Sequence, residues 1–165
     1  MDAGLLLARM VFGLVMAAHG SQKLFGWFGG YGLAGTGGFF ESLGFRPGRL
    51  FAAAAGGTEF VAGVLVALGL LGPLGPALII SVMIVAIATV HWSHGLFAQN
   101  NGIELPLLNV AAAAAIALIG NGAYSLDAVA GLSWPVEVVW IALGLGVLGG
   151  FANLAIRKAP TTAHA

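Results

Sequence analysis

The sequence predicts an all-α transmembrane helix bundle with four core helices and a fifth helix toward the C-terminal end. The first observation is that 59% of the 165 residues are hydrophobic and only 7% are charged, whereas a soluble domain carries about 25% charged residues. The second is that apolar residues gather into runs of about 20, the length that crosses a bilayer. Because lipid solvates apolar side chains well, we expect most of the surface to face a membrane.

Charge and cysteine content exclude several classes of function. The net charge is zero and the chain holds 6 Lys and Arg residues, so we expect no nucleic-acid partner, which would need clustered cations. The chain has no cysteine, and this excludes thiol–disulfide chemistry, Fe–S ligation and thiolate metal sites within it. The first apolar run lacks a basic start and is interrupted by Arg9, so we expect a spanning helix there and not a signal peptide.

Five segments are predicted to span the membrane. They are Gly4 to Gly20, Leu50 to Leu71, Pro76 to Phe97, Ile103 to Gly120, and Pro135 to Ile156. The fourth is short and rich in alanine. We therefore expect a four-helix membrane domain over residues 1–128 that includes a glycine- and aromatic-rich loop at 21–49. An additional transmembrane helix within 129–158 and a short cytoplasmic tail at 159–165 would follow.

The positions of lysine and arginine predict the orientation. One basic group flanks the first loop and another follows the last span: Lys23, Arg46, Arg49, Arg157 and Lys158. With five crossings both groups lie on the same side, and the opposite side carries Asp2 and Asp127. Because basic residues favour the cytoplasmic side, the N-terminus is predicted outside and the C-terminus in the cytoplasm.

Small residues mark the helix faces that are expected to pack. In lipid, close approach of two backbones matters more than a hydrophobic drive between helices. The helical period places Ala52, Gly56, Glu59 and Gly63 on one face of the second span. In the last span, Gly146 and Gly150 form a similar pair, beside Ala142 and Asn153.

The first loop contains the pattern G-x-G-x-x-G at Gly30, Gly32 and Gly35. This pattern marks a dinucleotide site only when it lies between a strand and a helix of a βαβ unit. Here a predicted span precedes it and no parallel sheet follows. We therefore reject a nucleotide site.

A short helix explains the second half of this loop better. Thr36 is a suitable N-cap for a helix from about Gly37 to Leu43. Gly44 suits the left-handed position that ends such a helix, and Phe45 would contact Phe40 as in a Schellman motif. The aromatic residues before it are typical of a membrane interface. They would form either an ordered cap on the cytoplasmic helix ends or a plain interfacial anchor.

Three stretches of the chain resemble the DoxX family of small bacterial membrane proteins. They are HGSQKLFGWFGG, then GTGGFFESLG through GGTEFVAGVLVALGLL, and NGIELPLLNVAAAAAIALIGNGAYSLDA. The resemblance covers Gly4 to Ala128, and its most specific part is HG-x-x-K-x-x-G. It implies a four-helix membrane protein associated with redox complexes, because the family is named for a subunit linked to a thiosulfate:quinone oxidoreductase. It implies no cofactor motif, and the segment from Trp134 onward lies beyond it.

Two ionisable residues fall inside predicted spans, where each needs a partner or water. Arg9 lies in the first span and Glu59 in the second, about one to two helical turns apart in depth. The two can form a buried ion pair, directly or through water, which would either fix the helix register or serve function. Glu59 is also a candidate for proton handling, since burial disfavours an unpaired carboxylate.

Histidines form the second polar group. His91 and His94 lie at i and i+3 and so share a helix face, and His19 and Glu104 are expected near the same rim. Such a set suits quinone hydrogen bonding, proton relay or metal binding. Interfacial histidines bonded to water or backbone are the simpler alternative. The spacing H-x-x-H does not specify a metal, and we predict none.

Two further polar residues are expected to find partners. Asn109, inside the fourth span, is expected to bond an adjacent helix. Lys23 is expected to contact Glu41, the last carbonyls of the first helix, or anionic lipid.

These observations support three hypotheses. The first is a membrane subunit of a quinone-linked oxidoreductase, in the bacterial inner membrane and dependent on a redox protein partner. Its candidate catalytic residues are Glu59, His91 and His94, and its candidate quinone-binding residues are His19, Lys23, Trp27 and Glu104. The second hypothesis is a small-solute or proton transporter, and the third is a non-catalytic membrane scaffold.

Overall fold

The computed structural model describes residues 2–158, and every regular element among them is helical. The α-helices are α1 (Asp2–Phe25), α2 (Gly32–Ser42), α3 (Gly48–Leu68), α4 (Leu74–Ala86), α5 (Glu104–Ile119), α6 (Leu126–Val129) and α7 (Val136–Ala155). A π-helical turn (Ile87–His91) continues α4, and 3-10 turns occur at Trp27–Gly29, Trp92–His94 and Ala98–Asn100. The predicted all-α class is confirmed. The predicted tail, 159–165, lies outside the described residues.

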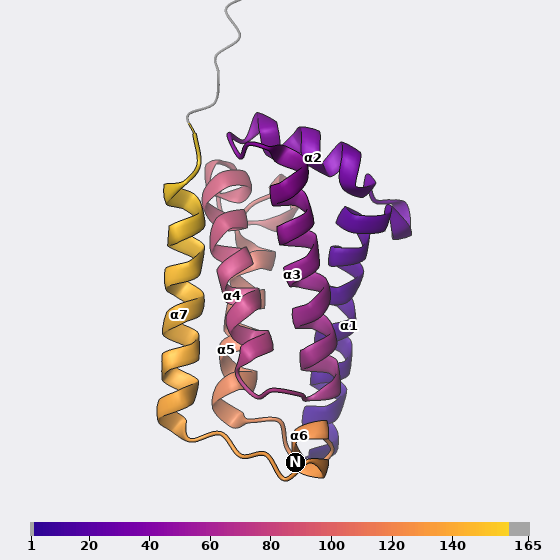
Figure 1. Ribbon diagram of the computed structural model, residues 1–165, viewed down its shortest axis with the longest axis vertical. Coiled ribbons are helices and arrows are strands. Elements are labelled where there is room, and N and C mark those ends of the chain that lie inside the picture. Colours follow the sequence, from indigo (N-terminus) through magenta and orange to yellow (C-terminus); the bar gives the residue numbers. More distant parts are fainter. Residues whose placement is uncertain (1, 159–165) are drawn as a thin grey trace, which may run out of the picture.

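Five helices form the bundle. Figure 1 shows α1, α3, α4, α5 and α7 side by side, with α2 laid across one end and α6 at the other. We call these the α2 end and the α6 end. Because α1 begins at the α6 end and α7 finishes at the α2 end, the chain crosses the bundle an odd number of times.

Four of these helices are long and apolar enough to cross a membrane. They are α1, α3, α7 and the continuous helix Leu74–His94. The fourth predicted span corresponds to α5, which has 16 residues. At about 1.5 Å per residue it is roughly 24 Å long and falls short of a hydrocarbon core of about 30 Å.

The basic residues other than Arg9 lie at the α2 end. The main-chain N–H of Lys158 donates to the Gly44 carbonyl at 2.9 Å, and the Arg157 guanidinium donates to the Leu43 carbonyl. The segment after α7 therefore lies against the loop after α2. The expected placement of both basic groups at one end is confirmed.

Glycines bring α1 and α3 into backbone contact. A Cβ added to Gly63 would lie 2.4 Å from the main-chain nitrogen of Ala17 and 2.5 Å from the carbonyl oxygen of Gly13. A Cβ on Gly20 would lie 2.5 Å from the carbonyl oxygen of Gly56. The two antiparallel helices thus touch along their length at positions where any side chain would separate them. The glycines of α1 were not singled out from the sequence.

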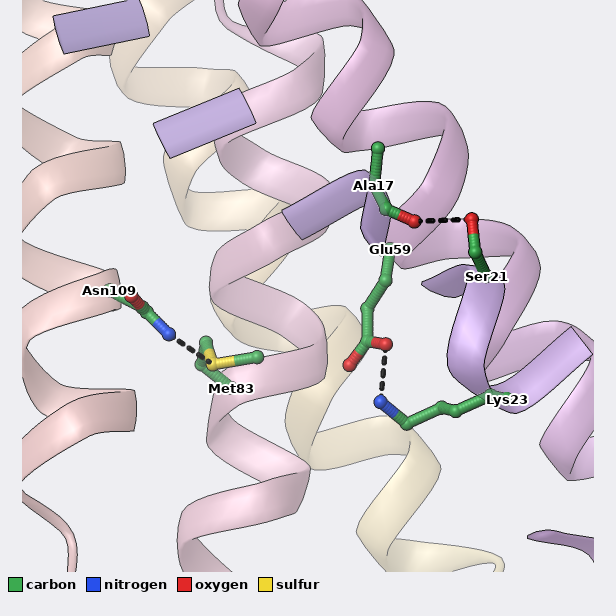
Figure 2. Close-up of polar contacts among 6 residues, drawn as sticks. All are labelled: Ala17, Ser21, Lys23, Glu59, Met83 and Asn109. Carbon is green, nitrogen blue, oxygen red and sulfur yellow. Dashed lines mark hydrogen bonds and ion pairs between the residues drawn. The ribbon is translucent and has the colours of Figure 1, made fainter. Parts of the chain in front are cut away.

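The predicted small-residue faces are confirmed. Ala52, Gly56, Glu59 and Gly63 are all buried on α3. On α7, Gly146 packs so closely on α4 that a Cβ would lie 2.4 Å from the Ala77 carbonyl oxygen, and Gly150 lies against Ile84. Asn109 bonds an adjacent helix as expected, since its amide donates to the Met83 sulfur of α4 at 3.6 Å (Figure 2).

The helix in the first loop begins earlier than predicted. α2 starts at Gly32, and Thr36 lies buried inside it, so the prediction that Thr36 caps the helix is wrong. The predicted end is confirmed. The Phe45 N–H donates to the Phe40 carbonyl and the Gly44 N–H to the Glu41 carbonyl, each at 3.0 Å, with Gly44 at φ +94°. This is the Schellman pattern.

A buried carboxylate organises the α6 end. Asp127 is 3% exposed and accepts four hydrogen bonds. Its donors are the N–H groups of Leu71 and Gly72, the Asn121 amide and the Trp134 indole, at 2.7–2.8 Å. One side chain therefore joins the α3–α4 loop to the segments on both sides of α6. From the sequence, Asp127 was predicted only to lie on the side opposite to the basic residues.

Arg9 lies at the α6 end and does not contact Glu59. It is fully buried, and it donates to the carbonyl oxygens of Val66 and Tyr124. Asp127 is the acidic group whose charge acts on it. The predicted ion pair between Arg9 and Glu59 is therefore wrong.

A Gly63→Ala substitution should destabilise the bundle by about 1–3 kcal/mol, because the new methyl group would meet backbone and not a movable side chain. Gly57→Ala on the same helix is the control. Its Cβ would meet nothing within 4 Å, so better helix propensity should leave stability equal or slightly higher. SDS titration in mixed micelles measures both variants. Equal stabilities would contradict the close contact of α1 with α3.

Asp127→Asn should cost at least about 3 kcal/mol, since the amide nitrogen cannot accept hydrogen bonds and Arg9 loses its nearby negative charge. Asp2→Asn is the matched control at the same end. Asp2 is exposed and accepts one long bond, 3.3 Å, from the Ala123 N–H, so its cost should stay below about 1 kcal/mol. The same titration compares them, and similar losses would refute the organising role of Asp127.

Candidate functional site

The centre of the candidate site is an ion pair between α1 and α3. The Lys23 ammonium contacts a carboxylate oxygen of Glu59, and Figure 2 shows the two side chains extended toward each other. Glu59 is 3% exposed and Lys23 is 27% exposed. Neither protein partner predicted for Lys23 is correct, since Lys23 contacts Glu59 and not Glu41 or the last carbonyls of α1, and Glu41 instead accepts from the Gly48 N–H.

Local sequence explains how the pair forms. α1 continues past the predicted end at Gly20 as far as Phe25, so Lys23 is still helical and lies one turn beyond Gly20 on the face that meets α3. A Cβ on Gly56 would lie 3.0 Å from the Lys23 Cβ. The methylene groups of Lys23 therefore pass over Gly56, which has no side chain and lies one turn before Glu59.

The ion pair borders a pocket of about 420 Å³ between α2, α3, α4 and α7. We call it the interhelical pocket. Its volume falls within the range of about 300–1,000 Å³ that is usual for ligand sites. Most of its wall is apolar, and its polar side chains are few: Lys23, Thr58, Glu59, Ser81, Thr89, His91 and Asn153.

Phenylalanines form the wall nearest the α2 end. Phe39 and Phe40 come from α2, Phe45 from the loop after it, and Phe51 from the first turn of α3. Neighbouring ring centroids lie 5.3 Å apart for Phe45 and Phe51, and 5.7 Å apart for Phe40 and Phe45. The Schellman turn thus places a stack of aromatic rings over the pocket.

The π-helical turn Ile87–His91 supplies another part of the wall. Thr89, Val90 and His91 all line the pocket. The Nδ1 atom of His91 lies 2.7 Å from the Asn101 carbonyl oxygen. Because a carbonyl only accepts, Nδ1 carries the hydrogen, and Nε2 of the neutral ring remains free to accept. Turns of this type often occur at functional sites.

The other predicted site residues lie elsewhere. His94 is exposed and its Nδ1 atom lies 2.8 Å from the Val90 carbonyl oxygen. His19 and Trp27 are exposed, and Trp27 stacks on Phe25 with centroids 5.0 Å apart. The Glu104 carboxylate accepts from the Ala98 N–H at 2.8 Å. None of these four lines the interhelical pocket.

The geometry limits which groups the site can hold. Within residues 2–158, no three His, Asp or Glu side chains are close enough together to bind a metal ion. An apolar ring with polar substituents suits the interhelical pocket better. Phenylalanines can pack against its faces, while the ion pair and His91 supply both donors and acceptors of hydrogen bonds.

A second pocket lies beside the first, under the glycine-rich loop. It has a volume of about 610 Å³ and is lined by Gln22, Lys23, Gly29, Gly30, Tyr31, Gly35, Thr36 and Phe39. We call it the loop pocket. Lys23 and Phe39 line both pockets, so these two side chains stand between them. Of the candidate binding residues predicted in this loop from the sequence, Lys23 lines the loop pocket and Trp27 does not.

Comparison with known proteins identifies the family. The DoxX family profile matches residues 4–92, which is more than half of the chain. The matched segment includes Lys23, Glu59 and His91, the charged and titratable residues of the interhelical pocket, but not the stretch from 93 to 128 in which a resemblance was also expected. No curated protein and no solved structure matches the chain. With its apolar helices, the chain is a multi-pass membrane protein that belongs to the DoxX family.

Proposed function

We propose that the interhelical pocket binds the ring of a lipid-soluble quinone, and that the chain is the membrane subunit of a quinone-linked oxidoreductase. The observation that carries this proposal is the combination of an aromatic wall with a buried ion pair in one pocket between apolar helices. A quinone has a flat apolar ring with two carbonyl oxygens. The phenylalanines match the ring, and Lys23 and the protonated form of His91 can donate to the oxygens.

Reduction of a quinone to a quinol consumes two electrons and two protons. The chain has no cysteine that could hold an Fe–S cluster, and we assign the supply of both electrons to a redox protein partner. In the ion pair the proton lies on the Lys23 ammonium, so Lys23 would give one proton to a quinone oxygen, and Glu59 would pass a replacement proton from water to Lys23. His91 in its protonated form would give the second through Nε2, while Nδ1 stays bonded to the Asn101 carbonyl.

We place the protein in the bacterial inner membrane, with the α2 end on the cytoplasmic side. The excess of Lys and Arg at that end supports this orientation. The pocket would then open near the cytoplasmic rim of the bilayer, where a quinone ring carried by its isoprenoid tail can reach it.

Ala55→Leu should weaken quinone binding by filling part of the pocket. Ala55 lines the pocket on α3, and its replacement leaves Lys23 and Glu59 unchanged. The measurement is calorimetric titration of the full chain in lipid nanodiscs with a short-chain ubiquinone. We expect measurable binding by the wild type and at least a tenfold loss of affinity in the variant, about 1.4 kcal/mol.

Ala111→Leu is the control, because Ala111 is exposed on α5 and outside the pocket. Its affinity should equal that of the wild type. Absence of binding by the wild type, or equal binding by all three proteins, would refute the quinone site. Solute flux in proteoliposomes without quinone binding would favour the transporter instead.

A further inference from the structure

The loop pocket carries an inference that does not depend on quinone binding. It lies under the glycine-rich segment that the quinone site does not use, and its only charged lining residue is Lys23. The same lysine forms the ion pair with Glu59 in the interhelical pocket. A ligand in one pocket can therefore act on the other through a single side chain.

Thr36 supplies an unused donor in the loop pocket. Threonine and serine inside helices commonly bond the carbonyl four residues earlier, as Ser21 does to Ala17 and Thr89 to Val85, both at 2.8 Å. Thr36 is 8% exposed, but its hydroxyl shows no such bond and is not one of the buried side-chain atoms that lack a partner within residues 2–158, so it is open to the pocket. Because Thr36 lines the loop pocket, its hydroxyl is available to a ligand there.

Lys23 and Thr36 supply the donors that the loop pocket offers a ligand. The first residues of α2, Gly32, Leu33 and Ala34, whose N–H groups have no partner within the helix, do not line the pocket. An ammonium and a hydroxyl on the wall of one pocket favour a ligand that is negatively charged and rich in acceptors.

We propose that the loop pocket binds a phosphate-type oxyanion, and that this anion draws Lys23 away from Glu59. The lysine side chain turns from one pocket to the other without any change in the helices. Glu59 then loses its counter-ion in a buried site and takes up a proton from water, because desolvation disfavours the lone carboxylate. Anion binding is thereby coupled to protonation of a carboxyl group inside the bundle.

The surroundings of Glu59 support this coupling. Lys23 from α1 and His91 from the turn after α4 are the other titratable groups that line the interhelical pocket. α2 contributes phenylalanines there, and α7 contributes the neutral Asn153. No second lysine or arginine lines the pocket to replace Lys23 as the counter-ion of Glu59.

The phosphate can come from two sources, a soluble ion or the headgroup of an anionic phospholipid. Dicyclohexylcarbodiimide distinguishes the states of Glu59, because it modifies buried carboxyl groups in their protonated form. The full chain is placed in phosphatidylcholine nanodiscs at constant ionic strength. Modification of Glu59 is followed by mass spectrometry without phosphate, with inorganic phosphate, or with phosphatidylglycerol in the discs.

We expect phosphate to raise the labelling of Glu59 at least threefold over a chloride control. A response to inorganic phosphate identifies a soluble ligand, and a response to phosphatidylglycerol alone identifies a lipid. Lys23→Gln should label fully in every condition, since the counter-ion is absent. No response to either source, or weak labelling of Lys23→Gln without phosphate, would overturn the proposal.

Thr36→Val tests the pocket itself. It removes the hydroxyl with little change in shape and leaves the ion pair intact, so the phosphate level for half-maximal labelling should rise about tenfold. Ser42→Ala is the matched control on α2, because the exposed Ser42 hydroxyl bonds the Phe39 carbonyl at 2.7 Å and lies outside the loop pocket. An unchanged response in Thr36→Val would place the anion elsewhere and overturn the proposal.

Discussion

The backbone contact between α1 and α3 is the constraint on which the candidate site depends. Gly13, Gly20, Gly56 and Gly63 allow the two helices to meet without side chains between them. In lipid this contact rests on packing and not on hydrophobic burial. It fixes the register of the helices, and the register determines that Lys23 stands opposite Glu59. A shift of one turn would leave a carboxylate alone inside the bundle.

The buried carboxylates at the two ends of the bundle differ in the number of their bonding partners. At the α6 end, Asp127 accepts four close hydrogen bonds and ties three segments together. A group so fully bonded stabilises a structure but has no capacity left for a ligand. At the α2 end, Glu59 has one ionic partner, and that partner is a flexible lysine with a pocket on each side. Lys23 therefore borders both pockets, and each proposal assigns it a role in ligand binding.

Much of the fold was predictable because its causes are local. The charge content and apolar runs predict the all-α bundle, and helical periodicity predicts the buried face that carries Gly56 and Glu59. Gly44 and Phe45 predict the end of α2, since a Schellman turn needs only neighbouring residues. These features depend on neighbouring residues and not on how distant parts of the chain pack.

The pairing of charges was not predictable because it depends on where helices end and how they stack. A first helix that stopped at Gly20 would leave Lys23 in a loop and Arg9 as the only partner for Glu59. The helix in fact continues to Phe25, and Arg9 finds carbonyl oxygens near Asp127. The π-helical turn that presents His91 and the missing bond of Thr36 likewise have no sequence signal, since tertiary packing decides them.

The Lys23–Glu59 contact is the centre of this account, and solid-state NMR in bilayers measures it directly. Lys23 and Lys158 are the only lysines, so labelled lysine Nζ and glutamate carboxyl carbons give a spectrum with few possible couplings. We predict one strong coupling, at a distance of about 4 Å or less, that disappears in Glu59→Gln. A strong coupling that survives in Glu59→Gln, or no coupling at all in the wild type, would contradict the account.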